Sequence, residues 1–262
     1  MMKKVEIVKI DTKAGTFQKV EDYVAEEAPT YIFINNKPYA TIMCTPKDLK
    51  ELVMGHLLSE GIVRAVEEIQ EITIKEEGVC HVKLKPEVDI ESRLKLASRL
   101  YRITPSACGG PYSPQILKRL KPVQSTVKVK AEIIQNSVKY LNSMAETFRK
   151  TGGVHVAAVF KADGDLVAIA EDVGRHNAVD KALGKAAMAE VAFSDCFLVL
   201  SGRLAADIVL KAARTGVPVI ASIAAALDSG IEIAKKAGLT LIGFVRGTRM
   251  NIYNAPERIL LS

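Results

Sequence analysis

The sequence predicts an α/β fold with a smaller α+β part at its N-terminal end. From about residue 130, short apolar runs alternate with helical segments of about ten residues, which is typical of parallel βαβ units. Before that point the apolar runs are separated by turn residues, which indicates short strands. Apolar residues make up 48% and charged residues 25% of the 262 residues, so the chain can build a core and is not expected to be disordered.

Residues 1–43 are predicted to form short strands. VEIVKI alternates apolar and polar residues, and YIFINNKPYATIM predicts two strands joined by a turn at residues 35–38. A further hairpin, ITIKEEGVCHVKLK, is predicted to turn near Glu77 and Gly78.

A helix is predicted to follow the first of these hairpins. Thr45 can cap it, Pro46 suits its first turn, and Asp48 places a carboxylate near the free backbone N–H groups. Gly61 can end it. Residues 89–102 predict a second, basic helix.

The part after residue 130 begins with a long amphipathic helix, AEIIQNSVKYLNSMAETFRK, which ends at the TGG of residues 151–153. VHVAAVFKADGDLVAIA follows as a hairpin that turns at Asp163 and Gly164. Helices from about residues 177, 204 and 228 then alternate with the runs CFLVLS, VPVIAS and LTLIGF. We therefore expect parallel strands with helices on both faces of the sheet.

These elements divide the chain into three expected parts. Residues 1–103 form an N-terminal α+β part, residues 104–129 a loop and linker that contains Cys108, and residues 130–262 the main α/β domain.

The formal net charge of +6 suits an anionic partner such as a phosphate-rich ligand, nucleic acid or an acidic protein. Lysines spread over solvated helix faces would give the same total. Tryptophan is absent and aromatic residues make up 5%, which argues against a stacking platform for single-stranded nucleic acid. Without a signal segment or an apolar run long enough to span a membrane, we expect a cytoplasmic protein with no membrane or nucleic-acid partner.

The four cysteines lie far apart and form no CxxC motif, so we expect free thiols and no zinc site. Cys44, Cys80 and Cys196 adjoin apolar strand residues and are predicted to pack in the core. Cys108 lies in ITPSACGGPYSP, where Gly and Pro favour turns and exposure. Basic residues on both sides would favour its thiolate if they face it, and the alternative is an incidental loop cysteine.

Polar and basic segments follow the predicted strands of the main domain. In such sheets ligands bind at the carboxyl ends of strands, and the planar fork of arginine suits bidentate contacts with phosphate. The turn Ser201–Gly202–Arg203 also precedes a helix, whose N-terminus adds backbone N–H donors. The arginines expected at this edge are Arg175, Arg203, Arg246 and Arg249. Together they predict an anion site, although each taken singly is more often a solvated surface charge.

Two histidines and two carboxylates near this edge have open roles. His155 begins a predicted strand and His176 lies in a polar turn, so each is either a hydrogen-bonded structural residue or one of a catalytic pair facing the same crevice. Asp172 can cap the following helix, while Glu171 either binds a ligand hydroxyl or is simply exposed.

Several motifs resemble the successive signatures of the formate dehydrogenase accessory proteins, the FdhD/NarQ family. They are TGGVHVAAV, EDVGRHNAVDKALG, LSGR, KAARTGVPVIAS and GLTLIGFVRGTRMNIY, and TPKDLKELVMGHLLSEGI resembles the N-terminal helix motif of the family. The resemblance spans nearly the whole chain.

The resemblance implies a main domain with a cytidine deaminase-like, three-layer α/β fold, a homodimer, and a role in maturing a molybdenum enzyme. It implies a sulfurtransferase that takes persulfide sulfur from a cysteine desulfurase. The sulfur passes to the bis-molybdopterin guanine dinucleotide molybdenum cofactor, a guanine-nucleotide-containing cargo, before this enters the formate dehydrogenase apo-enzyme. By position, Cys108 carries the persulfide. The residues expected to bind the cofactor are Arg175, His176, Ser201, Gly202, Arg203, Phe244, Val245, Arg246, Gly247, Thr248 and Arg249.

The cysteine loop departs from the family pattern of two cysteines, because Pro111 stands at the place of the second. A persulfide needs one sulfur anchor, so transfer stays possible, whereas a disulfide within the loop or a two-thiol relay does not. The sulfur donor could also be inorganic sulfide or another carrier.

Two alternatives to a sulfur carrier come from different classes. A zinc hydrolase acting on a nucleobase is rejected, because His155 is followed by Val156 and Ala157 rather than by an H-x-E motif, and CxxC is absent. A chaperone that binds the molybdenum cofactor without moving sulfur stays open.

Overall fold

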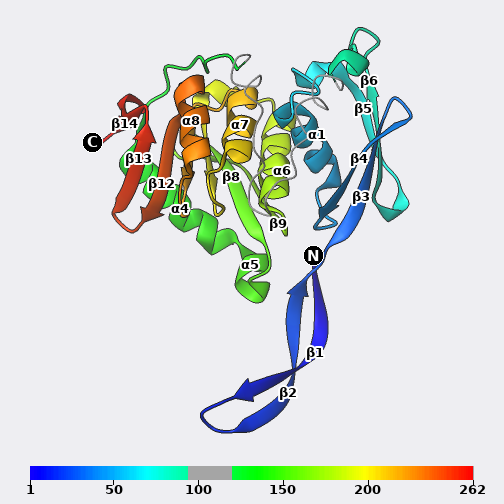
Figure 1. Ribbon diagram of the computed structural model, residues 1–262, viewed down its shortest axis with the longest axis vertical. Coiled ribbons are helices and arrows are strands. Elements are labelled where there is room, and N and C mark those ends of the chain that lie inside the picture. Colours follow the sequence, from blue (N-terminus) through cyan, green and yellow to red (C-terminus); the bar gives the residue numbers. More distant parts are fainter. Residues whose placement is uncertain (94–119, 262) are drawn as a thin grey trace.

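The computed structural model describes residues 1–93 and 120–261, and within them the α/β prediction is confirmed. Cys108 and residues 104–119 of the predicted linker lie outside the described residues. Two mixed sheets form the body of the molecule, with helices α1 and α6 between them, and a long hairpin projects away from this body (Figure 1). Across the described residues we find no helix with the length and apolar character needed to cross a membrane.

The larger sheet has the strand order β13–β12–β11–β10–β8–β9. Its strands are β8 (His155–Lys161), β9 (Leu166–Asp172), β10 (Cys196–Leu200), β11 (Val219–Ser222), β12 (Thr240–Arg246) and β13 (Arg249–Asn254). The central strands β10, β11 and β12 are parallel, as expected for βαβ units. Strand β8 pairs antiparallel with β10, and hairpins add the edge strands β9 and β13 antiparallel to β8 and β12.

Helices cover both faces of this sheet, as predicted. Buried leucine, valine and alanine side chains of three helices pack on one face, and a fourth helix packs on the other face against Phe160 and Phe197. The three helices are α6 (Arg175–Met188), α7 (Ala206–Thr215) and α8 (Asp228–Ala237), and the fourth is α4 (Ala131–Met144).

The long helix predicted before β8 is in fact two helices, α4 and α5 (Glu146–Thr151), with a break at Ala145. The Glu171 carboxylate accepts the backbone N–H groups of Thr147 at 3.1 Å and Phe148 at 2.9 Å, which starts a new helix. A continuous helix was the wrong expectation, because this acceptor comes from β9 and leaves no trace in the local pattern.

The smaller sheet has the order β4–β3–β6–β5 and contains both predicted hairpins. Asn35 and Asn36 adopt left-handed conformations with φ of 47° and 65°, as a tight hairpin turn requires. The strands are β3 (Ala28–Ile34), β4 (Lys37–Cys44), β5 (Ile69–Ile74) and β6 (Val79–Leu84). Short elements complete the chain: β7 (Val129–Lys130) with β14 (Ile259–Leu260), and the 3-10 turns Val66–Glu68, Glu76–Gly78, Phe193–Asp195 and Pro256–Arg258.

Helix α1 (Leu49–Ser59) joins the smaller sheet to the main domain by packing against α6. The two helices touch through glycine, since a Cβ atom at Gly55 would lie 1.8 Å from the Asp180 carbonyl oxygen and one at Gly184 would lie 1.9 Å from the Glu51 carbonyl oxygen. Their backbones are therefore in direct contact.

The predicted cap of α1 is not formed. Thr45 is buried and forms hydrogen bonds with the end of β9 instead. Its N–H donates to Asp172 Oδ2 at 3.0 Å, and its hydroxyl accepts the N–H of Val173 at 3.1 Å. The helix begins after Asp48, which has φ of 54° and makes no side-chain cap.

Candidate functional site

The polar segments predicted to share one edge of the large sheet do so. Leu200 of β10 is in register with Ser222 of β11, and the amino end of β8 lies at the same edge because His155 is in register with Asp172 of β9. The segments after β9, β10, β11 and β12 therefore meet there, as expected for an α/β sheet.

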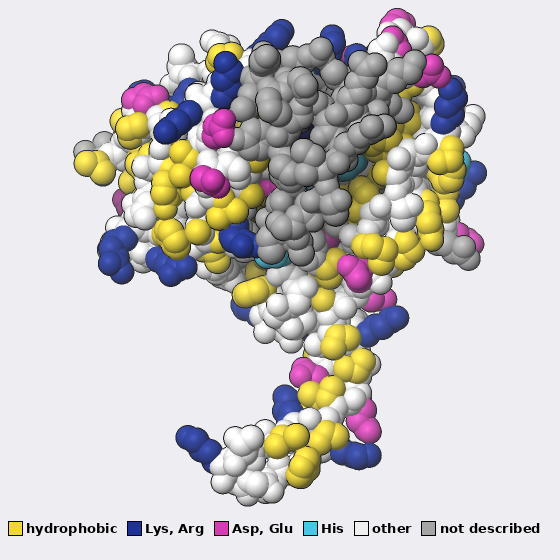
Figure 2. Space-filling view, viewed as in Figure 1, with side chains coloured by type: hydrophobic (Ala, Val, Ile, Leu, Met, Phe, Trp, Pro, Cys, Tyr) yellow, Lys and Arg dark blue, Asp and Glu magenta, His cyan; other side chains and the backbone are white. Residues whose placement is uncertain are grey.

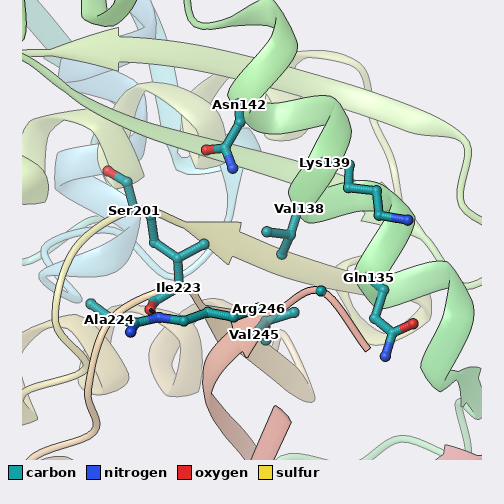
Figure 3. Close-up of a pocket in the computed structure, with 10 residues that line it drawn as sticks. Gln135, Val138, Lys139, Asn142, Ser201, Ile223, Ala224, Val245 and Arg246 are labelled. Atoms are coloured by element: carbon teal, nitrogen blue, oxygen red, sulfur yellow. Dashed lines mark hydrogen bonds between the residues drawn. The ribbon is translucent and has the colours of Figure 1, made fainter. Parts of the chain in front are cut away.

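A cavity of about 410 Å³ opens between this edge and α4 (Figure 3). Its volume lies in the range of about 300–1,000 Å³ that is usual for sites binding small molecules. The side chains of α4 and Arg246 face one another across it, with apolar contacts from Val138, Ile223 and Val245. The lining residues are Gln135, Val138, Lys139, Asn142, Ser201, Ile223, Ala224, Val245, Arg246 and Gly247.

Of the predicted cofactor-binding residues, Ser201, Val245, Arg246 and Gly247 line this cavity. The lining does not include Phe244, Thr248 and Arg249, or Arg175, His176, Gly202 and Arg203. Three polar residues of α4 were missed: Gln135, Lys139 and Asn142. A signal for them exists, because they repeat at spacings of four and three residues and so share one face of a helix that was expected to cover the sheet.

Hydrogen bonds lock the strand-end loops together beneath the cavity. Ser222 Oγ donates to the Gly202 carbonyl oxygen at 2.6 Å and accepts the N–H of Ala224 at 3.0 Å. The N–H of Phe244 donates to the Ala224 carbonyl oxygen at 3.0 Å, and Phe244 has φ of 52°, a left-handed conformation that is rare for a bulky residue. Such strain is characteristic of ligand-binding sites, where surrounding contacts hold it in place.

Arg246 is held against the cavity wall. Its Nε donates to the Ile223 carbonyl oxygen at 3.3 Å, and its guanidinium carbon lies 5.2 Å from the centre of the Phe244 ring. These contacts leave the terminal guanidinium nitrogens of an otherwise exposed side chain available to an anion.

Ser201 and His155 form a polar pair at the margin of the cavity. Ser201 Oγ accepts the N–H of Val156 at 3.1 Å and lies 3.2 Å from His155 Nδ1. Burial lowers the pKa of His155, and the positive charges of Arg175 and His176 lower it further. The His155 imidazole is therefore neutral at pH 7, which suits a hydrogen-bonding role.

Arg175 and His176 begin α6 and are paired with a carboxylate. Arg175 Nη2 lies 3.2 Å and His176 Nε2 2.6 Å from Asp207 Oδ2. Burial would raise the pKa of Asp207, but its hydrogen bond with His176 and the two positive charges outweigh burial and lower the pKa. The Asp207 carboxylate thus competes with any anion for these two side chains.

Behind this edge, Asp172 and Lys181 form a fully buried ion pair with 2.5 Å between Oδ2 and Nζ. Asp172 also accepts hydrogen bonds from the Gly174 N–H at 2.8 Å and from Asn177 Nδ2 at 2.9 Å. It therefore holds the turn before α6 rather than capping the helix, and Glu171 caps α5 rather than lying free.

The three described cysteines are buried, as predicted for Cys44, Cys80 and Cys196. Burial raises the pKa of Cys44, and it raises the pKa of Cys80 and of Cys196 to about 11. These thiols are therefore protonated and poorly nucleophilic at neutral pH.

A sequence model described as the FdhD/NarQ family matches residues 25–260. The chain is 38% identical over 259 residues to the sulfur carrier protein FdhD of Sulfolobus acidocaldarius, with 98% of each chain covered. It is 35% identical over 249 residues to the protein of the same name from Bacillus subtilis, covering 94% of this chain and 93% of the other.

Among solved structures, the fold matches a protein from Desulfotalea psychrophila that is described as a formate dehydrogenase accessory protein. The TM-score is 0.82 with 29% sequence identity, and the alignment covers 99% of both chains. With a family match over residues 25–260 and relatives aligned over nearly their full length, the chain belongs to the FdhD/NarQ family.

Proposed function

We propose that this protein is a sulfur carrier for formate dehydrogenase, with Cys108 as the carrying residue and the strand-end cavity as the place where the recipient binds. The proposed recipient is the bis-molybdopterin guanine dinucleotide molybdenum cofactor, before it enters the apo-enzyme. The observation that carries the proposal is the donor-lined cavity at the strand ends of a chain whose relatives are named sulfur carriers.

The three described cysteines are unsuitable as sulfur carriers, and this supports the assignment of Cys108. Cys44, Cys80 and Cys196 are buried with raised pKa values, so none of them readily supplies a thiolate. Cys108 lies outside the described residues, and its assignment rests on its Gly- and Pro-rich sequence and on the family resemblance.

The first proposed step moves sulfur without net oxidation. The Cys108 thiolate attacks the outer sulfur of a cysteine desulfurase persulfide, a new S–S bond forms on Cys108, and the desulfurase keeps its thiolate. Delivery of that sulfur at the oxidation level of sulfide takes two electrons. We assign these to a thiol reductant, which ends as a disulfide while Cys108 returns to the thiol.

The cavity supplies groups that suit a nucleotide-bearing cargo. Arg246 and Lys139 carry positive charge for phosphate oxygens, and the amide groups of Gln135 and Asn142 can pair with a base or sugar. Val138, Ile223 and Val245 provide apolar surface for a ring.

The first experiment incubates the protein with a cysteine desulfurase and cysteine and measures the protein mass. A gain of one sulfur atom that is absent in Cys108→Ala supports the carrier. Absence of any gain in the unaltered protein would rule the carrier out.

The second experiment titrates guanosine diphosphate and tests the cavity separately. Arg246→Ala is expected to weaken binding by about tenfold, the effect of losing one charge-assisted hydrogen bond to phosphate. Arg64→Ala, at an exposed site in the N-terminal part, is the matched control and should leave affinity unchanged. Equal affinity in Arg246→Ala and the unaltered protein would contradict the site.

A cofactor chaperone without sulfur transfer is the second candidate, favoured by one observation. Pro111 stands where the family pattern has its second cysteine, so a two-thiol relay is impossible. Nucleotide binding that responds to Arg246→Ala, together with no sulfur on Cys108, would identify the chaperone.

The remaining expectations stay proposals. They are the cytidine deaminase-like relationship of the main domain, the division at residues 104–129, a cytoplasmic location, a homodimer, and the absence of zinc.

A further inference from the structure

A second cavity, which we call the turn cavity, lies between α4 and the turn that joins β8 to β9, and its volume is about 450 Å³. With 3.6 residues per helical turn, the residues of α4 that line it lie on the opposite side of the helix from those that line the strand-end cavity. They are Ile133, Asn136, Ser137 and Tyr140. The two cavities share no lining residue, so the turn cavity is a separate site.

Ser137 lines the turn cavity with only 4% of its surface exposed. A buried hydroxyl inside a helix commonly donates to the carbonyl oxygen four residues earlier, as the hydroxyl of Thr151 does to Thr147 at 2.8 Å. The hydroxyl of Ser137 makes no hydrogen bond to any group in residues 1–93 and 120–261. Because a buried polar group without a partner costs free energy, we expect this hydroxyl to meet a ligand in the cavity.

Two exposed carboxylates, those of Asp163 and Asp165, also line the cavity. Within the described residues the turn uses one of their oxygens, since Asp163 Oδ1 accepts the N–H of Asp165 at 3.0 Å. In the same part of the chain no Lys or Arg nitrogen lies within 4.0 Å of either carboxylate. The fold therefore leaves both negative charges available to a cation.

The exposed glutamates of the hairpin that projects from the body are different, because each has a basic partner. This hairpin consists of β1 (Met2–Asp11) and β2 (Thr16–Ala25). Glu21 Oε2, for example, lies 2.9 Å from Lys4 Nζ, and Figure 2 shows acidic and basic side chains close together along the hairpin. The carboxylates of the turn cavity have no such pairing.

Aromatic and aliphatic side chains form the rest of the cavity wall. Tyr140 is 41% exposed, and its ring meets the buried ring of Phe160 edge-on, with 6.4 Å between the ring centroids. The face of a tyrosine ring attracts cations, and the apolar surface of Ile133 and Leu166 suits an aliphatic stem. The lining contains no lysine or arginine that would repel a cation.

We propose that the turn cavity binds a guanidinium group on an aliphatic stem, either in a free compound or in the arginine side chain of a partner protein. A guanidinium has five N–H donors and no acceptor. The cavity offers the matching acceptors, which are two carboxylates, the Ser137 hydroxyl and the carboxamide oxygen of Asn136. A guanidinium is also more weakly hydrated than an ammonium, so it enters a partly apolar cavity at a lower cost.

A metal ion is a poorer match than an organic cation. Among the described residues no group of three or more His, Cys, Asp or Glu side chains could hold one. The aromatic and aliphatic wall would also contribute nothing to a bare ion, whereas it can cover a carbon stem.

NMR titration of the isotope-labelled full chain tests the site with two probes, butylguanidine and N-acetylarginine amide. We expect saturable shifts of the Gly164 N–H signal, with a dissociation constant of about 1 mM or lower. N-acetylcitrulline amide, in which an uncharged urea replaces the guanidinium, should not shift this signal. Tighter binding of the arginine derivative would identify a protein side chain as the source, and equal or tighter binding of butylguanidine would identify a free compound.

Saturable binding of neither guanidinium probe, or an equal response to the citrulline derivative, overturns the proposal. Binding of Ca²⁺ in place of both guanidinium probes would also overturn it.

Removal of the two negative charges gives a second test. Asp163→Asn keeps an oxygen that can accept the N–H of Asp165, so the turn is preserved. Together with Asp165→Asn it should weaken the binding of N-acetylarginine amide at least about tenfold. Glu132→Gln is the matched control, because it removes an exposed charge of α4 outside the cavity, and it should leave the affinity unchanged. Equal affinities of the doubly substituted and the unaltered chain would refute the site.

Ser137→Ala distinguishes a ligand-binding hydroxyl from a structural one. The affinity for N-acetylarginine amide should fall about fivefold, whereas the Tm should stay the same or rise, because alanine favours a helix and the lost hydroxyl has no partner in the fold. A lower Tm with unchanged affinity would contradict the role of Ser137. None of these measurements depends on sulfur transfer, and Arg246→Ala, which tests the strand-end cavity, should leave this affinity unchanged.

Discussion

The contact between α1 and α6 can be tested by whether one substitution, Gly55→Ala, raises or lowers the free energy of unfolding. In an exposed helix interior, Gly→Ala stabilises a protein by about 0.8–1.0 kcal/mol because alanine restricts the unfolded chain. At Gly55 the added Cβ would lie 1.8 Å from the Asp180 carbonyl oxygen, whereas real Cβ contacts essentially never fall below 3.0 Å. The helices would have to separate by about 1.2 Å, the difference between these two distances, and the obstacle is backbone that cannot rotate away.

Overpacking of this kind typically costs 1–3 kcal/mol, and a backbone clash lies at about the upper end. Subtracting the propensity gain, we expect Gly55→Ala to lower the free energy of unfolding by about 2 kcal/mol. For a chain of this size that corresponds to a fall in Tm of about 4–8 °C. Gly184→Ala should behave alike, because its Cβ would meet the Glu51 carbonyl oxygen from the other side of the same contact.

Urea unfolding followed by circular dichroism measures these changes. The double variant should lose less stability than the sum of the single variants, since the second methyl group enters helices that are already apart. Lys50→Ala, at an exposed position of α1, is the control and should stay within about 0.5 kcal/mol of the original. Stabilisation by Gly55→Ala would show that the helices do not touch as described.

Four further predictions concern charged and titrating side chains. In Arg175→Gln the pKa of His155 should rise toward its usual value, because a positive charge that lowers it is gone. NMR titration of the imidazole measures this pKa, and an unchanged value would contradict the placement of Arg175 close to His155. The same lowered pKa means that the contribution of His155 to stability is present above pH 6.5 and falls as the pH drops below it, since the unfolded chain then binds the proton more readily. Lys211→Met should cost about 3–5 kcal/mol at pH 7, because it removes the buried ammonium group that lies 2.9 Å from the fully buried carboxylate of Asp180. The loss should shrink in acid as Asp180 takes up a proton, and a loss independent of pH would argue against this ion pair. Glu171→Gln should cost about 1 kcal/mol through the lost cap of α5, whereas Glu146→Gln, in an exposed ion pair, should leave the free energy of unfolding almost unchanged. Equal costs would reject the capping role.

Much of the fold could be predicted because its signals are local. The hairpin turns at Asn35–Asn36 and at Gly164 could be predicted because these residues tolerate positive φ. The alternation of apolar runs with helices predicts the parallel strands at the centre of the large sheet. The gathering of Ser201 and Arg246 at one edge follows from the same alternation, because parallel strands end on the same side.

What could not be predicted depends on partners far away in the chain. Thr45 looks like a helix cap, but it is used by Asp172, 127 residues later. The helix is interrupted before α5 because the Glu171 carboxylate of β9 accepts the first N–H groups of α5. Gln135, Lys139 and Asn142 line the cavity only because α4 packs over the strand ends.

The sequence by itself determined the order of the elements, the loops that end the strands, the core cysteines and the resemblance to the FdhD/NarQ family. Periodicity and turn chemistry act over a few residues, so they can be read directly from the chain. Only the tertiary structure decided which charged groups are buried and paired with each other, as Asp172 and Lys181 are, and which remain available to a ligand, as Arg246 does. A charged group must be paired when it is buried, and its partner is chosen by packing in three dimensions rather than by its neighbours in the sequence.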